Sequence, residues 1–220
     1  MALILNIDTA VETASVCLSN DAELISLYIN DSPKDHATWL HTAIRKLIRE
    51  AKLSLNDLQA VAISIGPGSY TGLRIGLSAA KGFCYALNIP LITIGTLEMM
   101  AYAIVKEDAQ LFCPLIDARR MEVFTAVYDK SLQEIMKPCA LIINENSFAN
   151  LLSLHKIIFC GNGTKKIQHL LSHTNALFSD ATATAADLPH LASKNFQEGN
   201  FSDLAYTEPL YIKEFYSPAR

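Results

Sequence analysis

The chain has 220 residues, 50% of them apolar, and a formal net charge of -4. This length allows one large domain or two small lobes with a sizeable core, and the acidic balance argues against a protein that neutralises many phosphates by itself. The first residues lack a basic flank and reach an acid at Asp8, so they predict a buried strand and no signal peptide. Because no uncharged apolar run reaches the roughly 18 to 20 residues of a membrane span, we expect a cytoplasmic protein.

The first half of the chain predicts three strands followed by an alternation of helix and strand. Apolar residues recur every three or four positions from Leu40 to Ala51, which indicates an amphipathic helix. A buried apolar run then leads into a glycine turn and a second helix, which Asn88 and Pro90 end. The expected strands are residues 3–7, 15–18, 23–29 and 60–65, and the expected helices are residues 36–53 and 69–87.

The second half repeats this order. Asp117 follows an apolar run as Asp8 does, and Gly161-Asn162-Gly163 corresponds to Gly66-Pro67-Gly68. Two copies of one βββαβα unit are therefore expected, connected by an apolar, helix-like stretch. The expected strands are residues 111–116, 123–128, 134–142 and 156–160, the expected helix is residues 144–154, and the connecting stretch is residues 96–105.

A duplicated unit of this kind resembles the plan of the actin, sugar-kinase and Hsp70 superfamily. The resemblance implies an α/β, ribonuclease H-like fold with two lobes, each a mixed β-sheet flanked by helices. The N-terminal lobe is expected at residues 1–100 and the C-terminal lobe at residues 101–220, with the last strand or helix able to pack back on the first lobe. Fold alone does not assign a function.

The five cysteines and six histidines predict no metal or redox site. The cysteines are odd in number, far apart and without a CxxC pair, so we expect buried, inert thiols. His36 and His41 are five residues apart, and on a helix of 3.6 residues per turn their side chains point about 140° apart. Two imidazoles in this arrangement do not share one metal ion without unwinding the helix.

The string from Gly66 to Gly76 has two interpretations. Its glycines permit a tight turn whose backbone amides could hold an anion at a helix start; alternatively, Ser69 is simply the N-cap of a helix. Asp8 and Asp117 could likewise hold magnesium beside a nucleotide, or cap turns, and the two arginines after Asp117 could bind phosphate, pair with Glu122 or face solvent. The candidate nucleotide or anion contacts are Asp8, Thr9, Gly68, Ser69, Tyr70, Thr71, Asp117, Arg119 and Arg120.

The string Gly66-Pro67-Gly68-Ser69-Tyr70-Thr71-Gly72-Leu73-Arg74-Ile75-Gly76 resembles the signature of the TsaB (YeaZ) family. The likeness extends over most of the chain: Ile7-Asp8-Thr9-Ala10 resembles the family's first turn, Asp117-Ala118-Arg119-Arg120 its second, and Pro209-Leu210-Tyr211-Ile212-Lys213 its closing strand. Met121 stands where the second turn usually has glycine.

Membership of this family would imply an accessory, non-catalytic subunit of the bacterial complex that makes threonylcarbamoyladenosine beside the anticodon of tRNA. The subunit would bind and activate the transferase TsaD, work with the ATPase TsaE and the adenylate-forming TsaC, and meet tRNA only through the complex. It would need no cofactor itself, whereas the complex uses ATP and magnesium. An autonomous kinase or ATPase is the alternative, and a peptidase activity is expected to be absent.

The partner interface that the resemblance implies lies on the two helices of the first half, which would pack against TsaD or against a second copy of this chain. Small residues on the second helix suggest close helix approach, although a core helix without a partner would show the same pattern. Gly76→Arg is accordingly expected to abolish pairing while the monomer stays folded. The predicted interface residues are His36, Trp39, Leu40, Ile44, Gly72, Ile75, Gly76, Ala79, Ala80 and Phe83.

Overall fold

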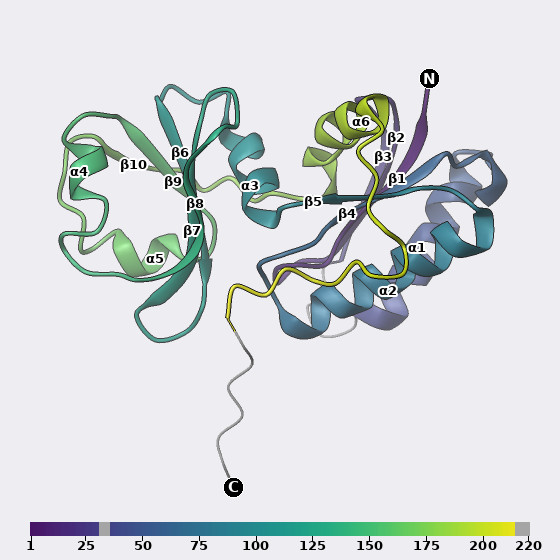
Figure 1. The fold of residues 1–220 in the computed structure, drawn as a ribbon, viewed down its shortest axis with the longest axis horizontal. Helices are drawn as coiled ribbons and strands as arrows, with labels where there is room; N and C mark the ends of the chain where they lie inside the picture. Colours follow the sequence, from purple (N-terminus) through teal and green to yellow (C-terminus); the bar gives the residue numbers. More distant parts are fainter. Residues whose placement is uncertain (31–35, 214–220) are drawn as a thin grey trace, which may run out of the picture. The chain divides into compact units, whose positions relative to one another are not determined.

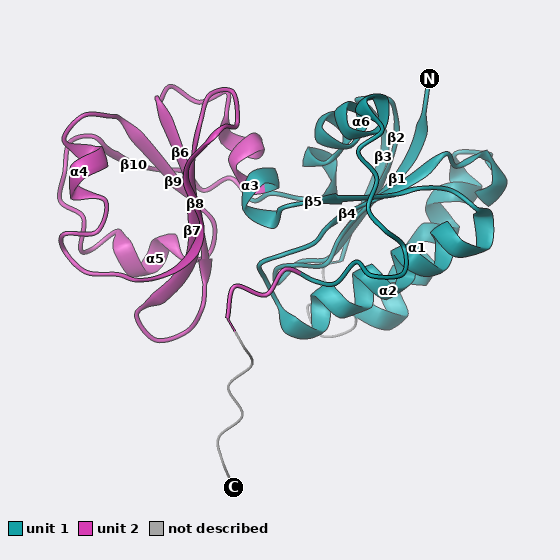
Figure 2. Ribbon diagram, in the orientation of Figure 1, with its two compact units in different colours: residues 1–99, 182–209 teal, residues 100–181, 210–220 magenta. Residues whose placement is uncertain are grey.

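The computed structural model describes residues 1–30 and 36–213, which form two compact units (Figure 1, Figure 2). Unit 1 comprises residues 1–99 and 182–209, and unit 2 comprises residues 100–181 together with the chain from residue 210 onward. The chain therefore enters unit 2 near the expected boundary but returns to unit 1 for residues 182–209. No helix within the described ranges is long and apolar enough to cross a membrane.

Unit 1 is a five-stranded sheet in the order β3-β2-β1-β4-β5. The central strand β1 runs antiparallel to β2 and parallel to β4. Its elements are β1 (Leu3–Asp8), β2 (Ser15–Asn20), β3 (Glu23–Ile29), α1 (His36–Glu50), η1 (Leu55–Asp57), β4 (Ala60–Ser64), α2 (Tyr70–Leu87), β5 (Leu91–Ile94), the start of α3 (Thr96–Ile104), η2 (Ala185–Asp187) and α6 (Pro189–Glu198).

Unit 2 repeats the topology, because its sheet has the order β8-β7-β6-β9-β10 and its central strand β6 again runs antiparallel to β7 and parallel to β9. This repetition confirms the predicted duplication and the actin-like, mixed-sheet fold. The elements are β6 (Leu111–Asp117), β7 (Glu122–Asp129), β8 (Glu134–Ile142), α4 (Ala149–Leu152), β9 (Ile157–Cys160), α5 (Thr164–Ile167) and β10 (Ala176–Phe178).

The two faces of the unit 1 sheet differ in chemistry. Leu5 and Ile7 of β1 belong to the apolar core that α1 and α2 cover, whereas Asn6 and Asp8 are buried polar residues that alternate with them. The opposite face is covered by η2 and α6, which contact β1, β2, β3 and β5. There the backbone N–H of Ala185 donates to Ser15 Oγ of β2 over 2.8 Å. The sheet is therefore covered on both sides by segments far apart in sequence.

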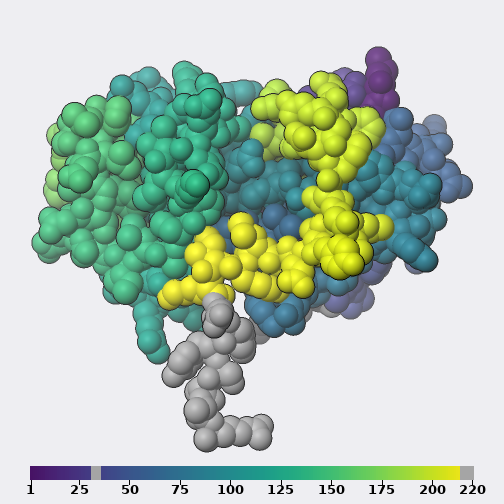
Figure 3. Space-filling model, viewed as in Figure 1, coloured from purple at the N-terminus to yellow at the C-terminus, as the bar shows by residue number. Residues whose placement is uncertain are grey.

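The segment after α6 lies at the surface of unit 1 (Figure 3). Ser202 donates its backbone N–H to the carbonyl of Leu91 over 2.8 Å, and Lys81 of α2 donates to the carbonyls of Ala205 and Thr207. Residues 182–209 are thus fastened to the unit by hydrogen bonds as well as by the packing of α6.

Several local predictions were wrong. Residues 209–213 form no strand, so the predicted closing strand is absent from this position. The helix expected over residues 144–154 contracts to α4, because the side chains of Asn144 and Ser147 accept hydrogen bonds from nearby backbone N–H groups and stabilise a turn instead. The short strands β5 and β10 and the helix α6 were not predicted.

All five cysteines are free thiols; four are buried and Cys139 is half-buried. Burial raises the pKa of Cys17 and of Cys113 to about 12, and that of Cys84 to about 11. Thiols with such pKa values are poor nucleophiles near neutral pH, as expected for structural cysteines.

Candidate functional site

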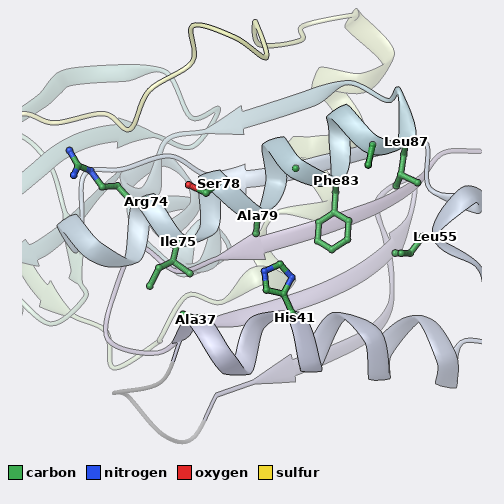
Figure 4. A pocket seen from close by; sticks show the side chains of 11 residues that line it. Ala37, His41, Leu55, Arg74, Ile75, Ser78, Ala79, Phe83 and Leu87 are labelled. Carbon is green, nitrogen blue, oxygen red and sulfur yellow. The ribbon is translucent and has the colours of Figure 1, made fainter.

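An open groove of about 710 Å³ lies between α1 and α2 of unit 1 (Figure 4). His41 projects from α1 toward α2, and the ring of Phe83 projects from α2 toward α1 (Figure 4), with 6.0 Å between the ring centroids. Most of the lining is hydrocarbon. The lining residues are Ala37, His41, Leu55, Arg74, Ile75, Ser78, Ala79, Gly82, Phe83, Ala86 and Leu87.

The groove exists because α2 is apolar on two adjacent faces. One face carries Leu73, Leu77, Ala80 and Cys84, which are buried within unit 1. The adjacent face, spaced at three and four residues, lines the groove. A helix with this pattern packs on its own sheet with one face and leaves the other available for a second surface.

Gly72 and Gly76, which were predicted at the partner interface, face the sheet and not the groove. A Cβ atom at Gly72 would stand 2.1 Å from the carbonyl oxygen of Thr9, and a Cβ at Gly76 would stand 2.2 Å from Thr9 Oγ1 and 2.9 Å from the Cδ1 of Ile63. Thr9 Oγ1 also donates a hydrogen bond of 2.8 Å to the carbonyl of Gly72. These glycines are required for close packing of α2 on the turn after β1.

Other predicted interface residues also belong to the interior. Leu40, Ile44 and Ala80 are at most 1% exposed and sit in the hydrophobic core. Trp39 is half-buried and packs against that core, and His36 Nδ1 lies 3.3 Å from the side-chain amide of Asn30. Of the predicted set, the residues that line the groove are Ile75, Ala79 and Phe83.

The sequence contained a signal for the groove that the prediction missed. Gly82 lies three residues after Ala79, and a Cβ atom added to it would meet nothing within 4 Å. On a helix, residues spaced at three and four positions share a face, so Ile75, Ala79, Gly82 and Ala86 form one stripe. Gly72 and Gly76 lie on the neighbouring face, which packs against the sheet, and the prediction was based on them.

The glycine-rich loop is held against the turn after β1. The backbone N–H of Ser69 donates to the carbonyl of Ala10 over 2.6 Å, and a Cβ atom at Gly68 would stand 2.2 Å from the same oxygen. Ser69 Oγ accepts from the backbone N–H of Gly72 as the N-cap of α2. The N-cap interpretation is confirmed, while anion contacts by Gly68, Ser69, Tyr70 and Thr71 stay a prediction.

Asp8 is a buried carboxylate with no exposed surface. Its Oδ1 accepts hydrogen bonds from Ser64 Oγ at 2.5 Å and from the backbone N–H of Ala10 at 3.1 Å, whereas Oδ2 is buried without a hydrogen-bond partner. Desolvation outweighs these hydrogen bonds and raises the pKa of Asp8 to about 6, and the charge of Asp187 contributes in the same direction. The turn-capping role is confirmed, and a nucleotide or magnesium contact by Asp8 and Thr9 stays a prediction.

The raised pKa of Asp8 makes the stability of the protein depend on pH. A carboxyl group whose pKa is higher in the folded state stabilises the fold when protonated, so the free energy of unfolding should fall as pH rises from about 4 to about 6. The shift from 3.8 to about 6 corresponds to about 3 kcal/mol at about 1.4 kcal/mol per pKa unit. We expect Asp8→Asn to remove most of this slope in denaturant unfolding.

In the Asp8→Asn variant, Asp187 should cause the pH dependence of stability that remains, because burial raises the pKa of Asp187 as well. The matched control is Asp203→Asn, since Asp203 accepts backbone hydrogen bonds from Ala205 and Tyr206 but is exposed. Equal slopes for the wild type and Asp8→Asn between pH 4 and 6 would contradict the assignment.

Asp117 of unit 2 has a different environment, because it is exposed and accepts hydrogen bonds from Lys166 Nζ at 2.5 Å and from the backbone N–H of Arg119 at 2.6 Å. Partial burial raises its pKa, but these donors outweigh that effect and the pKa lies below its ordinary value. Glu122 pairs with Lys213 at 2.6 Å. Arg119 and Arg120 are exposed, with φ of 69° and 51°. Both arginines, which precede Met121 in the turn, therefore have a left-handed backbone conformation.

Asp8 and Asp117 therefore have structural partners in their own units. Binding of phosphate or nucleotide by these acids or by Arg119 and Arg120 is untested. The kinase or ATPase alternative stays a prediction, for which magnesium-dependent binding of ATP to the isolated chain is the test. Within residues 1–30 and 36–213, no three His, Cys, Asp or Glu side chains are grouped so that they could hold a metal ion.

Comparison with known protein sequences gives a consistent result. The model of the TsaD family, described as tRNA N6-adenosine threonylcarbamoyltransferase, matches residues 30–215. The chain is 30% identical over 223 aligned positions to the tRNA threonylcarbamoyladenosine biosynthesis protein TsaB of Escherichia coli K12, covering 96% of this chain and 94% of the relative. The TsaB protein of Bacillus subtilis 168 is 35% identical over 125 positions, covering 57% of this chain and 54% of the relative.

Comparison with solved structures supports the same fold. A Pseudomonas aeruginosa protein described as similar to peptidase YEAZ superposes with a TM-score of 0.86 at 25% identity, covering 97% of this chain and all of that one. YeaZ from Pseudomonas aeruginosa gives 0.83 at 24% identity, covering 96% of this chain and all of that one. The activator of the 2-hydroxyisocaproyl-CoA dehydratase from Clostridium difficile, at 0.50 and 7% identity over 90% of this chain and 97% of that one, shares the fold alone.

Proposed function

The chain belongs to the TsaB (YeaZ) family and has a role in tRNA threonylcarbamoyladenosine biosynthesis, and we propose that it acts there as a non-catalytic subunit that binds and activates TsaD. The observation that carries the proposal is the apolar groove between α1 and α2. Grooves of this kind take an amphipathic helix whose apolar residues fill them.

The shape of the groove suits a helix. Ala79, Gly82 and Ala86 give α2 a narrow stripe of small side chains, over which the backbone of another helix can approach closely. Ile75 and Phe83 stand beside this stripe as larger, half-buried apolar side chains. A partner helix that covered them would exclude water from hydrocarbon surface, which is the main driving force of association.

The chemistry of the lining also favours docking over catalysis. Its titratable side chains are the imidazole of His41, which faces the ring of Phe83, and the guanidinium of Arg74, which lies over the ring of Tyr70 at 3.9 Å. Aromatic and arginine side chains beside an apolar stripe are typical of protein interfaces. In this proposal the transfer chemistry, the use of ATP and magnesium and the contact with tRNA belong to the complex with TsaD, TsaE and TsaC.

The direct test is complex formation with the cognate TsaD, measured by size-exclusion chromatography with light scattering. We expect a complex whose mass is the sum of one copy of this chain and one copy of TsaD. It should form without added TsaE. Separate elution of the two proteins at every concentration tested would overturn the proposal.

A further inference from the structure

The turn between β6 and β7 has an unusual backbone. Arg119 and Arg120 have φ of 69° and 51°, a left-handed conformation that glycine adopts freely and that residues with a Cβ atom adopt at a cost. Turns that need two such residues in succession usually carry Asn-Gly or Asp-Gly. Because the local backbone does not favour arginine here, the two exposed side chains themselves are the candidates for a function.

The acids of the turn do not engage these arginines. Lys166 Nζ donates to Asp117 Oδ1 at 2.5 Å and to the carbonyl of Glu122 at 2.8 Å, and Lys213 Nζ pairs with the Glu122 carboxylate at 2.6 Å. The charge of Arg119 helps to lower the pKa of Asp117. Within residues 1–30 and 36–213, however, neither arginine side chain has a hydrogen-bond or ion-pair partner. Since each acid already has a lysine, the two arginines are a surplus of positive charge.

The same turn also offers backbone donors. Arg119 donates its N–H to Asp117 Oδ1, and Glu122 donates its N–H to the carbonyl of Arg119 over 3.1 Å, which fixes the turn. The N–H groups of Arg120 and Met121 have no acceptor in the described part of the chain. Successive free N–H groups in a turn form a concave donor site for an anion. Together with two guanidinium groups, they make a set of donors that suits phosphate oxygens.

We propose that this turn holds phosphate groups of the RNA backbone, and that it adds a contact to tRNA when this chain is bound to TsaD. The inference rests on the proposed function, because an acidic chain with two surplus cations at one turn cannot neutralise enough phosphates to bind RNA by itself. The planar fork of arginine matches phosphate oxygens. Phosphate contacts position a nucleic acid without reading its bases, so the turn would help to orient the tRNA.

A free nucleotide also carries phosphates, and a protein surface can carry carboxylates. A nucleotide site has to recognise a base and a ribose as well, whereas the donors at this turn match phosphate groups. The family acts in the biosynthesis of a modified tRNA nucleoside, which favours RNA over an acidic protein as the source of the anion. The experiment below distinguishes the three ligands.

The test variant is Arg119→Gly with Arg120→Gly, which removes both guanidinium groups and places glycine where φ is positive. A second test variant, Arg119→Gln with Arg120→Gln, removes the charges and keeps long side chains. The control is Lys106→Ala with Lys130→Ala, which removes the same charge from exposed lysines of unit 2. Lys106 precedes β6 and Lys130 follows β7, whereas the turn joins the other ends of these two strands.

Each protein is combined with the cognate TsaD, and complex formation is checked by size-exclusion chromatography with light scattering. Binding of a labelled transcript of the substrate tRNA to the complex is then measured by fluorescence anisotropy between about 0.05 M and about 0.2 M salt. We expect both turn variants to form the complex and to bind tRNA about tenfold more weakly at low salt, a few-fold for each exposed charge contact. The slope of log Kd against log salt should decrease by about 1 to 2, and the control should match the wild type.

Each contrary result has its own meaning. If both turn variants form the complex and bind tRNA with wild-type affinity and salt dependence, or if the wild-type complex binds no tRNA, the inference is wrong and the proposed function stands. If the wild type forms no complex with TsaD, the proposed function fails and the inference fails with it. Loss of the complex in the turn variants alone would show that the turn contacts protein, which overturns the inference.

Two further results would also overturn it. Equal weakening of tRNA binding in the control would show an effect of net charge that is not specific to the turn. Binding of ATP to the isolated chain that depends on Arg119 and Arg120, with tRNA binding unchanged in the variants, would show that the phosphates belong to a nucleotide.

Discussion

Gly76→Arg should unfold unit 1, whereas Gly82→Arg, the same substitution on the same helix, should leave it folded. At Gly76 the new Cβ atom would stand 2.2 Å from Thr9 Oγ1 and 2.9 Å from Ile63, with the rest of a charged side chain directed into the core. Overpacking combined with a buried, unpaired charge accounts for the largest single-residue losses, above about 4 kcal/mol. This replaces the expectation from sequence that the Gly76 variant stays folded.

At Gly82 an added Cβ atom would meet nothing within 4 Å, and the position lines the groove. Replacing glycine inside a helix should stabilise that helix by up to about 1 kcal/mol. The chain has one tryptophan, Trp39, which packs against the core of unit 1, so its fluorescence during urea unfolding reports on this unit. A Gly76→Arg protein with a wild-type unfolding midpoint would show that α2 is packed differently from the structure described here.

We expect the Gly82→Arg protein to stay folded but to lose its binding to TsaD. The arginine would occupy the floor of the groove and hold a partner helix away from Ala79 and Phe83. Blocking the centre of an interface commonly costs more than about 3 kcal/mol, so we expect the affinity to fall by at least about 100-fold.

The matched control for this binding experiment is Tyr85→Arg. Tyr85 is on α2, is 83% exposed and does not line the groove, and its replacement adds the same charge as Gly82→Arg. Calorimetric titration of both variants with the cognate TsaD should show wild-type affinity for Tyr85→Arg alone. Equal affinity for both variants would show that TsaD binds elsewhere on the chain.

Much of the fold could be predicted from sequence because its signals are local and repeated. The apolar runs ending at Asp8 and Asp117, each followed by a strand that leads into a glycine turn, indicated the duplication that the two sheets confirm. The strand β10 has three residues and carries too little periodicity to stand out. The sequence analysis allowed the last strand or helix to pack back on the first lobe. Which residues return to unit 1 depends on long-range contacts such as that of Ala185 with Ser15, which sequence spacing does not reveal.

The site was harder to predict than the fold, because α2 has two apolar faces that periodicity alone cannot rank. Gly76 and Gly82 are both glycines within the same helix, and they differ in that Thr9 and Ile63 lie beside the first whereas no atom lies beside the second. Leu40 and Ile44 were expected at the interface for a related reason, since an apolar residue on an amphipathic helix marks a buried face without saying what buries it. In this chain their own core buries them.

The central claim is that this chain is required for the reaction although it does not carry out the chemistry. Its most direct test is threonylcarbamoyl transfer to tRNA in a reconstituted mixture of the cognate TsaC, TsaD and TsaE, with wild-type chain, with Gly82→Arg or with no chain added. We predict transfer with the wild type and background transfer in the other two mixtures. Equal transfer without the chain, or turnover by the chain without TsaD, would contradict the claim.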